Sequence, residues 1–241
     1  VDVGRDVTLA DLRADGYKAF YVAIGCQGGR KAGVPGEDAE GIQTAVTLLR
    51  TVGDDEHYKM SGKTVVIGGG NVAIDAARVS LRCGADEVTM VCLEPRDGMP
   101  ASDEEIAEAE EEGTAIRCGY GPKEFVTENG RVIAVVLKKC TSLYNAEGRF
   151  APSYDENDTI TLPCDNVVLS IGQCIEWGGL LDGEAVELGR GQGAVADPLT
   201  YQTAQPDVFV GGDVYTGPRF AIDAIAAGKQ GAVSIHRFMQ P

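Results

Sequence analysis

Five short runs of apolar, mostly branched residues recur along the chain, and most of them close on glycine. They cover residues 21–25, 64–68, 88–93, 166–172 and 208–212. Such runs are typical of strands that are buried on both faces of a parallel sheet. After the second run, apolar residues from Val72 to Leu81 recur at helical spacing. The succession of strand, glycine turn, helix and strand predicts a βαβ unit and therefore an α/β fold.

A different pattern follows between residues 123 and 162. Residues 123–140 contain two strand-like runs joined by Asn129-Gly130, a dipeptide that favours the positive backbone angles of a type I′ hairpin turn. A third strand is expected at residues 158–162. Together these runs predict an antiparallel β-meander inserted among the βαβ elements.

Residues 102–112 have the composition of an acidic helix. We expect Ser102 to be its N-cap, with Glu105 three residues later completing a capping box. Dense acidity of this kind is typical of a solvated helix face. A surface that meets a basic partner is the alternative.

The glycine turn of the βαβ unit carries the strongest chemical signal. Residues 65–78 read VVIGGGNVAIDAAR, so Gly68, Gly70 and Ala73 form G-x-G-x-x-A between a strand and a helix. The first glycine permits the tight turn, the second lets the backbone approach a pyrophosphate, and the small third residue lets the helix lie against the strand. The helix N-terminus then offers N–H groups to the phosphates. The predicted dinucleotide contacts are Gly68, Gly69, Gly70, Asn71, Val72 and Ala73.

The residue at the end of the next strand normally contacts the adenosine ribose of the dinucleotide. Glu94 lies there, where an acidic side chain accepts hydrogen bonds from the ribose hydroxyls and repels a 2′-phosphate. Arg96 follows two residues later, and a guanidinium at this point would pair with a 2′-phosphate instead. The two residues favour different nucleotides, and we expect NAD(H) in preference to NADP(H).

Charge and cysteine usage exclude several functions. The formal net charge is −16 and the sequence pI is about 4.5, which argues against nucleic acid or anionic membrane as a partner. No apolar run approaches the roughly 18 residues of a membrane span. The seven cysteines include no C-x-x-C pair, so we expect neither a disulfide framework nor a metal site. This usage, with no signal peptide, indicates a cytoplasmic protein.

The order of the motifs resembles that of the glutamate synthase small (beta) subunit and its relatives. These include the corresponding part of dihydropyrimidine dehydrogenase and the NADH-dependent ferredoxin:NADP oxidoreductases, which are flavoproteins with two dinucleotide-binding domains. The resemblance covers nearly the whole chain and rests on residues 23–38, 65–78, 99–101 with Glu105 and 111–113, 167–173 and 208–232. It implies a Rossmann-like fold and an oxidoreductase that passes electrons from NAD(P)H through FAD to iron–sulfur centres or a partner subunit.

The resemblance also implies further cofactor contacts. A Gly-Gly-Asp that closes a strand contacts FAD in the family, which corresponds to Gly212 and Asp213 here. Arg219, Phe220 and Ala221 would lie near the flavin ring, and Gly25 would belong to the same FAD site. The matching residues of the NAD(P) site would include Gly172 and Gln173. Helix N–H groups near a flavin stabilise the negative charge that builds up on reduction.

Two departures from the family pattern matter. Members that prefer NADPH carry two arginines where this chain has Leu93 and Glu94, which supports NADH. The first G-x-G-x-x-G and the cysteine-rich iron–sulfur domain are also absent, and the chain begins at Val1, so we expect a piece of a longer protein. The resemblance assigns residues 1–42 to the C-terminal portion of the first half of the FAD domain. Residues 43–173 would be the NAD(P)-binding domain, and 174–241 the returning segment of the FAD domain.

Two functions remain open. In the full-length parent we expect an NAD(P)H-dependent FAD oxidoreductase, with the isolated chain inactive because the cradle for the FAD pyrophosphate is missing. The alternative is a dinucleotide-binding or docking module without turnover. A disulfide reductase of the thioredoxin reductase type would need a C-x-x-C or otherwise paired cysteine, which the sequence does not supply. Hydride transfer needs geometry and electrostatics, so no catalytic acid or base is predicted.

Overall fold

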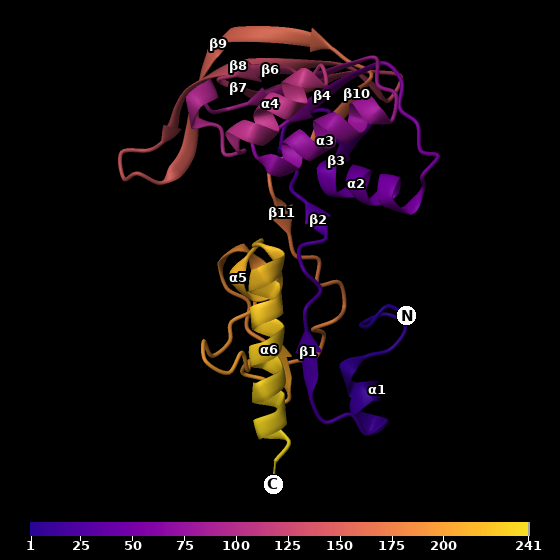
Figure 1. Cartoon of the computed structure of the whole chain (residues 1–241), viewed down its shortest axis with the longest axis vertical. Coiled ribbons are helices and arrows are strands. Elements are labelled where there is room, and N and C mark those ends of the chain that lie inside the picture. The colour runs from indigo at the N-terminus through magenta and orange to yellow at the C-terminus, as the bar shows by residue number, and fades with distance from the viewer. Residues whose placement is uncertain (241) are drawn as a thin grey trace. The chain divides into compact units, whose positions relative to one another are not determined.

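The computed structural model describes residues 1–240 and divides into two compact units. Unit 1 comprises Val1–Gly28 and Gln173–Pro241, and unit 2 comprises Gly29–Gly172. The sequence predicted that the chain would pass from one domain to the other near residues 42 and 173; we call these two passages crossings. The first crossing lies earlier because the segment after Gly29 leads into a strand of the unit 2 sheet. The short strands β2 (Gly28–Gly29) and β11 (Gln173–Cys174) mark the two crossings (Figure 1).

A five-stranded parallel sheet forms the centre of unit 2 (Figure 1). Its order is β3 (Ile42–Thr44), β10 (Asn166–Leu169), β4 (Lys63–Ile67), β5 (Glu87–Cys92) and β6 (Ala115–Cys118). Chain order runs outward from β4 through β5 to β6, whereas β10 pairs with the opposite edge of β4. The direction of winding therefore reverses between β4 and β10, as in doubly wound α/β folds.

Both faces of this sheet are buried, and alternate residues of each strand face different layers. Val66, Met90 and Val168 pack against the helices α2 (Ala45–Asp54), α3 (Asn71–Arg82) and α4 (Asp103–Glu111). Val65, Val91 and Val167 pack against the opposite layer, which is the meander. Burial on both faces explains why these strands read as continuous apolar runs.

The meander consists of β7 (Tyr120–Glu128), β8 (Arg131–Tyr144) and β9 (Phe150–Pro163), all antiparallel. The hairpin turn is confirmed, since Asn129 and Gly130 have φ angles of 52° and 82°. The predicted third strand was too short, because β9 begins at Phe150. Its first part is polar and mostly exposed, so it lacks the apolar alternation that marks a half-buried strand.

Helix α4 confirms the predicted N-cap but only half of the capping box. The Oγ of Ser102 accepts a hydrogen bond from the Glu105 amide at 3.3 Å. The Glu105 carboxylate does not return a bond to the backbone of Ser102, and its Oε2 is buried without a hydrogen-bond partner. The prediction of a complete box was therefore wrong. The side chain of Glu105 turns inward instead.

Unit 1 has fewer regular elements. Besides β11, they are α1 (Leu9–Ala14), β1 (Phe20–Val22), the 3-10 turn η2 (Arg190–Gln192), β12 (Val208–Val210), α5 (Asp213–Thr216) and α6 (Ala221–Phe238). β1 and β12 form a parallel pair. Arg13 ties distant segments together: its Nη1 and Nη2 lie 2.7 and 2.6 Å from the Glu184 carboxylate, and its Nη2 lies 3.0 Å from Asp207 Oδ1.

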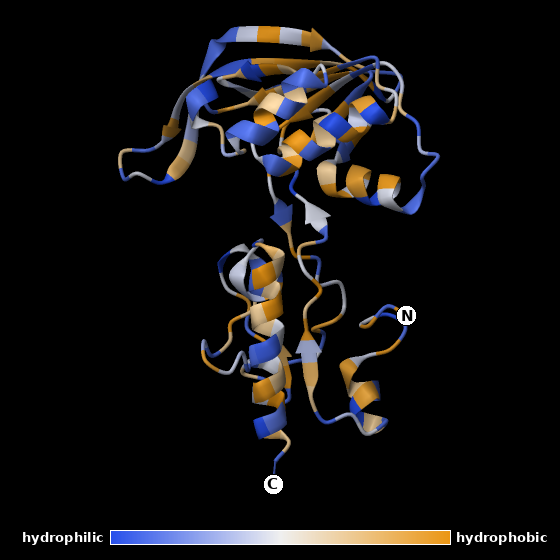
Figure 2. Cartoon of the chain, in the orientation of Figure 1, coloured by the Kyte–Doolittle hydropathy of each residue, from blue (hydrophilic) through white to orange (hydrophobic). Residues whose placement is uncertain are grey.

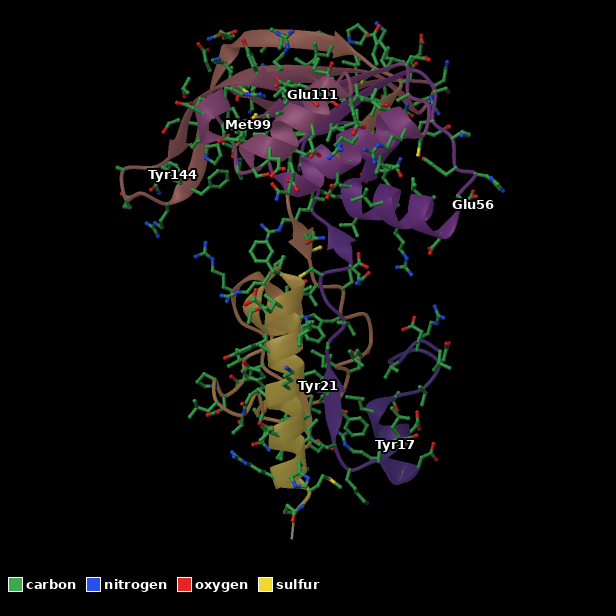
Figure 3. The ribbon with its side chains drawn as sticks, in the orientation of Figure 1. Tyr17, Tyr21, Glu56, Met99, Glu111 and Tyr144 are labelled. Carbon is green, nitrogen blue, oxygen red and sulfur yellow. The ribbon has the colours of Figure 1, made fainter. Side chains whose placement is uncertain are left out.

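Tyr21 of β1 packs closely against α6 (Figure 3). A Cβ at Gly231 of α6 would lie 2.1 Å from the ring carbon Cε2 of Tyr21, and one at Gly211 would lie 1.8 Å from its hydroxyl. Only glycine leaves room for this ring. The N-terminal part of α6, in contrast, carries exposed apolar side chains: Phe220, Ile222 and Ile225 are 80%, 74% and 57% exposed. The ribbon of α6 alternates between hydrophobic and hydrophilic colours along its length (Figure 2).

The ion pairs between α3 and α4 give stability that depends on pH. Glu112 Oε1 lies 2.5 Å from Arg82 Nη2 and 2.7 Å from Arg78 Nη2. These hydrogen bonds, first from Arg82 and then from Arg78, lower the pKa of Glu112 from 4.5 to about 2. Because the folded pKa is depressed, the contribution of Glu112 is complete above pH 4.5 and is lost as the pH falls toward about 2.

We expect thermal melting of the wild-type chain to show this loss as the pH is lowered between those two values. Glu112→Gln should melt lower at neutral pH and fall less steeply with acid, because it carries no titrating group. Glu111→Gln is the matched control, since this neighbouring exposed acid should leave the wild-type pH profile in place. Identical acid profiles for Glu112→Gln and wild type would contradict the assignment.

Candidate functional site

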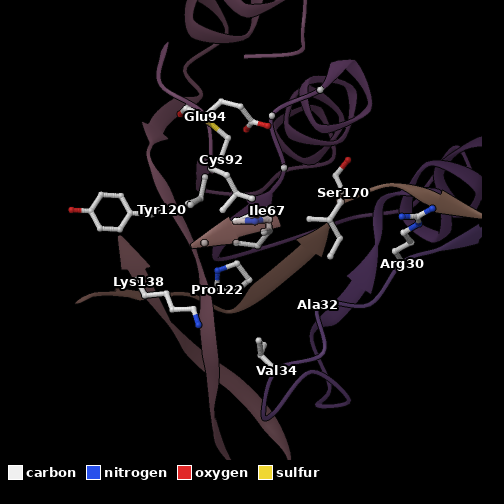
Figure 4. Close-up of a pocket in the computed structure, with 18 of the residues that line it drawn as sticks. Arg30, Ala32, Val34, Ile67, Cys92, Glu94, Tyr120, Pro122, Lys138 and Ser170 are labelled. Atoms are coloured by element: carbon white, nitrogen blue, oxygen red, sulfur yellow. Dashed lines mark hydrogen bonds between the residues drawn. The ribbon is translucent and has the colours of Figure 1, made fainter. Parts of the chain in front are cut away.

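A cavity of about 530 Å³ opens at the carboxyl ends of the central strands of unit 2 (Figure 4). Ile67 closes β4, Cys92 closes β5, and Ser170 follows β10; all three line the cavity. The cavity therefore lies where the winding of the sheet reverses. In open α/β sheets this crevice is the usual place for a ligand.

The glycine turn after β4 forms one wall of the cavity. Gly68 has a φ of 147°, and a Cβ there would lie 2.3 Å from the carbonyl oxygen of Ser170. A Cβ at Gly69 would lie 2.9 Å from both Cys92 Cβ and Glu94 Oε2. A Cβ at Gly70 would meet nothing within 4 Å. The first two glycines are thus required by the protein itself, whereas Gly70 borders open space in which a ligand could approach the backbone.

Helix α3 begins directly after this turn. Its N-cap is Gly70, which supplies no side-chain hydrogen bond. The Ala73 amide donates to the Gly70 carbonyl at 2.9 Å, so the amides of Asn71 and Val72 remain available to an anion. Ala73 is fully buried, as expected for a helix that lies close to β4, and Val72 packs against the same core. The side chain of Asn71 is already engaged, since its Oδ1 accepts a hydrogen bond from the Ser102 amide at 3.1 Å.

Glu94 and Arg96, the two residues expected to distinguish NAD(H) from NADP(H), line different hollows. Glu94 lines the cavity beside Gly69. Arg96 instead lines a neighbouring hollow of about 580 Å³ and forms an ion pair with α4, its Nη2 lying 2.5 Å from Glu110 Oε2. The guanidinium is therefore held toward α4, and the carboxylate of Glu94 is the charged group next to the glycine turn.

The meander supplies a wall that the sequence did not predict. Pro122 and Lys138 line the cavity opposite the glycine turn (Figure 4). Tyr154 also lines it. Lys138 Nζ lies 4.4 Å from the centroid of the Tyr154 ring and 2.7 Å from Glu156 Oε1. Burial raises the pKa of Tyr154, which keeps its hydroxyl protonated as a donor. No motif marks these residues, because only the fold of the insertion brings them to the sheet.

The remaining predicted nucleotide contacts lie at the edge of unit 2. Gly172 has a φ of 110°, and its carbonyl accepts a hydrogen bond from the Arg30 amide at 3.0 Å. Arg30 also lines the cavity, so Gly172 is close to it. Gln173 is the first residue of β11 and belongs to unit 1.

The six residues expected to contact FAD all belong to unit 1. Gly25 and Gly212 have φ angles of 68° and 65°, which favour glycine. Gly212 precedes α5, and Asp213 Oδ1 accepts a hydrogen bond from the Arg219 amide at 3.3 Å. Phe220 is the N-cap of α6 and supplies no side-chain hydrogen bond. Its carbonyl accepts from the Asp223 amide at 3.0 Å, so the amides of Ala221 and Ile222 are the ones left open at this helix start.

The fold brings together two cysteines that are distant in sequence. Cys92 and Cys118 are 26 residues apart in sequence, yet they are directly opposite each other in the register of β5 and β6. The pKa of Cys92 is raised to about 12 by burial and then by the neighbouring Cys118. The chain therefore does hold a paired set of thiols. Sequence spacing could not reveal it, because the pairing follows from strand order.

Comparison with known proteins agrees with this geometry. The model of the family described as pyridine nucleotide-disulphide oxidoreductase matches residues 1–228. The chain is 37% identical to the NADP(+)-dependent formate dehydrogenase subunit beta of Moorella thermoacetica, covering 99% of this chain and 34% of that protein. It is 32% identical to the glutamate synthase [NADPH] small chain of Escherichia coli, covering 99% and 54%. The chain thus spans about half or less of these curated relatives.

Solved structures confirm the predicted fold class. FprA from Mycobacterium tuberculosis in complex with NADPH superimposes with a TM-score of 0.78 at 20% identity, over 99% of this chain and 67% of that one. Thioredoxin reductase from T. acidophilum gives a TM-score of 0.69 at 22% identity. The Rossmann-like fold and the resemblance to glutamate synthase small subunits are both confirmed. The chain belongs to the pyridine nucleotide-disulphide oxidoreductase family.

Proposed function

We propose that unit 2 binds a nicotinamide dinucleotide and that the chain is the electron-transferring part of a longer NAD(P)H-dependent flavoprotein oxidoreductase. The observation that carries the proposal is the uncapped N-terminus of α3 behind an open glycine at the switch point of the sheet. This arrangement offers amides and a positive helix dipole to a pyrophosphate. The relatives named above, which are NADP(+)- and NADPH-dependent proteins, agree with a nicotinamide ligand.

The residues of unit 2 suggest how the dinucleotide would be held. Gly68 to Ala73 would bind the phosphates, and Glu94 would accept hydrogen bonds from the adenosine ribose. Lys138 and Tyr154 form the opposite wall. Gly172, the last residue of unit 2, and the adjoining Gln173 would complete the site. The open face of Gly70 fits this cradle, because a side chain there would occupy the space that a phosphate needs.

Glu94 supports NADH as the preferred nucleotide, although the names of the relatives specify NADP(+) or NADPH. A carboxylate beside Gly69 would repel a 2′-phosphate, and Arg96 is held by Glu110. We therefore expect calorimetry to give a lower Kd for NADH than for NADPH. Glu94→Ala should weaken NADH binding roughly tenfold, since it removes hydrogen bonds to an ionised group.

The matched control is Asp97→Asn, which removes a nearby exposed acid. It should leave the affinities for both nucleotides unchanged. Tighter binding of NADPH than NADH by the wild-type chain, or an unchanged NADH affinity in Glu94→Ala, would contradict the preference. Neither result would contradict dinucleotide binding itself.

FAD is proposed for unit 1 of the full-length protein. Gly25, Gly212 and Asp213 would contact its ribityl and pyrophosphate region, and Arg219, Phe220 and Ala221 would lie near the ring. Two properties support an incomplete domain: β1 and β12 form a sheet of two strands, and the start of α6 exposes large apolar side chains. A sheet of two strands is marginal by itself. The isolated chain should therefore bind FAD weakly.

In the parent protein, the bound cofactors would supply hydride transfer from nicotinamide to flavin, and electrons would pass on to iron–sulfur centres or a partner subunit. The residues of this chain would bind and orient the cofactors and exclude water from the cavity. We name no catalytic acid or base. The cysteine usage favours a reducing, cytoplasmic location.

The second candidate function is a dinucleotide-binding or docking module without turnover. It is favoured by the incomplete FAD region of this chain. Absorbance and dye reduction separate the two candidates. A full-length protein that is yellow and reduces an artificial acceptor with NADH would support the oxidoreductase. A colourless full-length protein without such activity would support the module.

A further inference from the structure

Cys92 and Cys118 occupy positions that can be joined by a disulfide. They are paired in register on the parallel strands β5 and β6, and neighbouring strands lie about 4.8 Å apart. Disulfides join residues whose Cα atoms are roughly 4.4–6.8 Å apart. Residues in register on adjacent strands point to the same face of the sheet. Burial and then the neighbouring Cys118 raise the pKa of Cys92, which agrees with this pairing in register.

The two thiols differ in their access to solvent. Cys92 is 2% exposed, and burial is the main cause of its raised pKa. Cys118 is half-buried and lines the hollow beside Arg96 and Lys139. Its Sγ lies 4.0 Å from the Sδ of Met99. An oxidant would thus reach Cys118 from the hollow, and Cys92 would be the resolving thiol.

Cys92 also connects the pair to the proposed nucleotide site. Its side chain lines the cavity, and its Cβ would lie 2.9 Å from a Cβ at Gly69. Its thiol donates a weak hydrogen bond to the carbonyl of Glu94 at 3.6 Å. A disulfide would remove this donor, because the thiol proton is lost. The segment that carries Glu94 would then lose one of its contacts with the strand.

We propose that Cys92 and Cys118 form a reversible disulfide when a peroxide oxidises Cys118, and that this disulfide weakens nucleotide binding. The sulfur of Cys118 attacks one peroxide oxygen, the O–O bond breaks, and the Cys118 thiol proton leaves with the departing hydroxide as water, so that a sulfenic acid remains on Cys118. The sulfur of Cys92 then attacks the Cys118 sulfur, the S–O bond breaks, and the second water leaves with the Cys92 proton. Two thiols are oxidised by two electrons and one peroxide is reduced to two waters. The second half of the proposal rests on the proposed function.

The test treats the chain with hydrogen peroxide and maps disulfides by mass spectrometry of an unreduced digest. We expect a peptide pair joined through Cys92 and Cys118 that disappears with dithiothreitol. Calorimetry before and after oxidation should show a roughly tenfold loss of NADH affinity, as for a lost hydrogen-bonded contact, with recovery on reduction. Cys118→Ser should bind NADH normally and resist the loss, and Cys118→Ala serves if the serine variant melts lower.

Cys140→Ser is the matched control, because Cys140 lines the same hollow but is not in register with Cys92. It should respond to peroxide like the wild type. Absence of the Cys92–Cys118 peptide in a sample whose Cys140 is oxidised would overturn the disulfide. The peptide without a change in NADH affinity would overturn its effect on binding. A reduced chain that does not bind NADH would overturn the proposed function, while the mapping still decides the disulfide.

Discussion

Gly68→Ala is expected to destabilise unit 2 by about 2–5 kcal/mol, the sum of backbone strain and steric overlap. The added Cβ would lie 2.3 Å from the Ser170 carbonyl oxygen, and the φ of 147° is unfavourable for alanine. Neither partner can move easily. Ser170 is bound to β4 through its amide, which donates to the Ile67 carbonyl at 2.7 Å, and the Gly68 amide donates to Val91 at 2.8 Å.

Hydrogen–deuterium exchange provides the measurement, because it reports on unit 2 separately from unit 1. Peptides from β4, α3 and β10 should exchange much faster in Gly68→Ala than in wild type, whereas peptides from α6 should not change. The matched control is Gly70→Ala, whose Cβ meets no neighbour within 4 Å. Equal protection of β4 in Gly68→Ala and wild type would show that the turn tolerates a side chain.

Gly70→Val is expected to affect nucleotide binding strongly and the stability of the fold only slightly. The fold should tolerate it at a cost of about 1 kcal/mol, the usual penalty for an apolar N-cap, because its backbone is extended and the space around it is open. NADH affinity should fall by at least about a hundredfold, since the side chain would displace the pyrophosphate from the amides of α3. Thermal melting and calorimetry on the same sample separate the two effects. Gly70→Ala should give an intermediate affinity.

The sequence predicted the βαβ unit of the fold because local and tertiary preferences agree there. The branched apolar residues of β4 and β5 are buried on both faces, and the glycines after β4 are required by the approach of Ser170 and Cys92. The hairpin at Asn129 was equally clear, since its turn needs positive φ. In these segments the local sequence determines the backbone conformation, so the elements predicted from the sequence agree with those in the structure.

The elements that the sequence did not predict depend on tertiary contacts. β3 (Ile42–Thr44) and β6 (Ala115–Cys118) are short edge strands whose residues are mostly half-exposed, so they lack a clear apolar run. Of β9, the sequence predicted only the last part, because the first part pairs with β8 at the edge of the meander and is mostly exposed.

The same limit applies to the candidate site. Motifs gave the glycine turn and Glu94, which are local in sequence. The wall formed by Lys138 and Tyr154 comes from the folded insertion, and the juxtaposition of Cys92 with Cys118 comes from strand order. Arg96 was ambiguous in sequence because its partner, Glu110, lies on the next helix. Residues that only the fold brings together have no characteristic spacing in the sequence.

Calorimetric titration of NADH into the wild-type chain and into Gly70→Val tests the central claim most directly. The expected result is saturable binding of one nucleotide per wild-type chain and loss of binding in a variant that melts within a few degrees of wild type. No binding by the folded wild-type chain would contradict a nucleotide site in unit 2. Undiminished binding by Gly70→Val would contradict the role of the glycine turn.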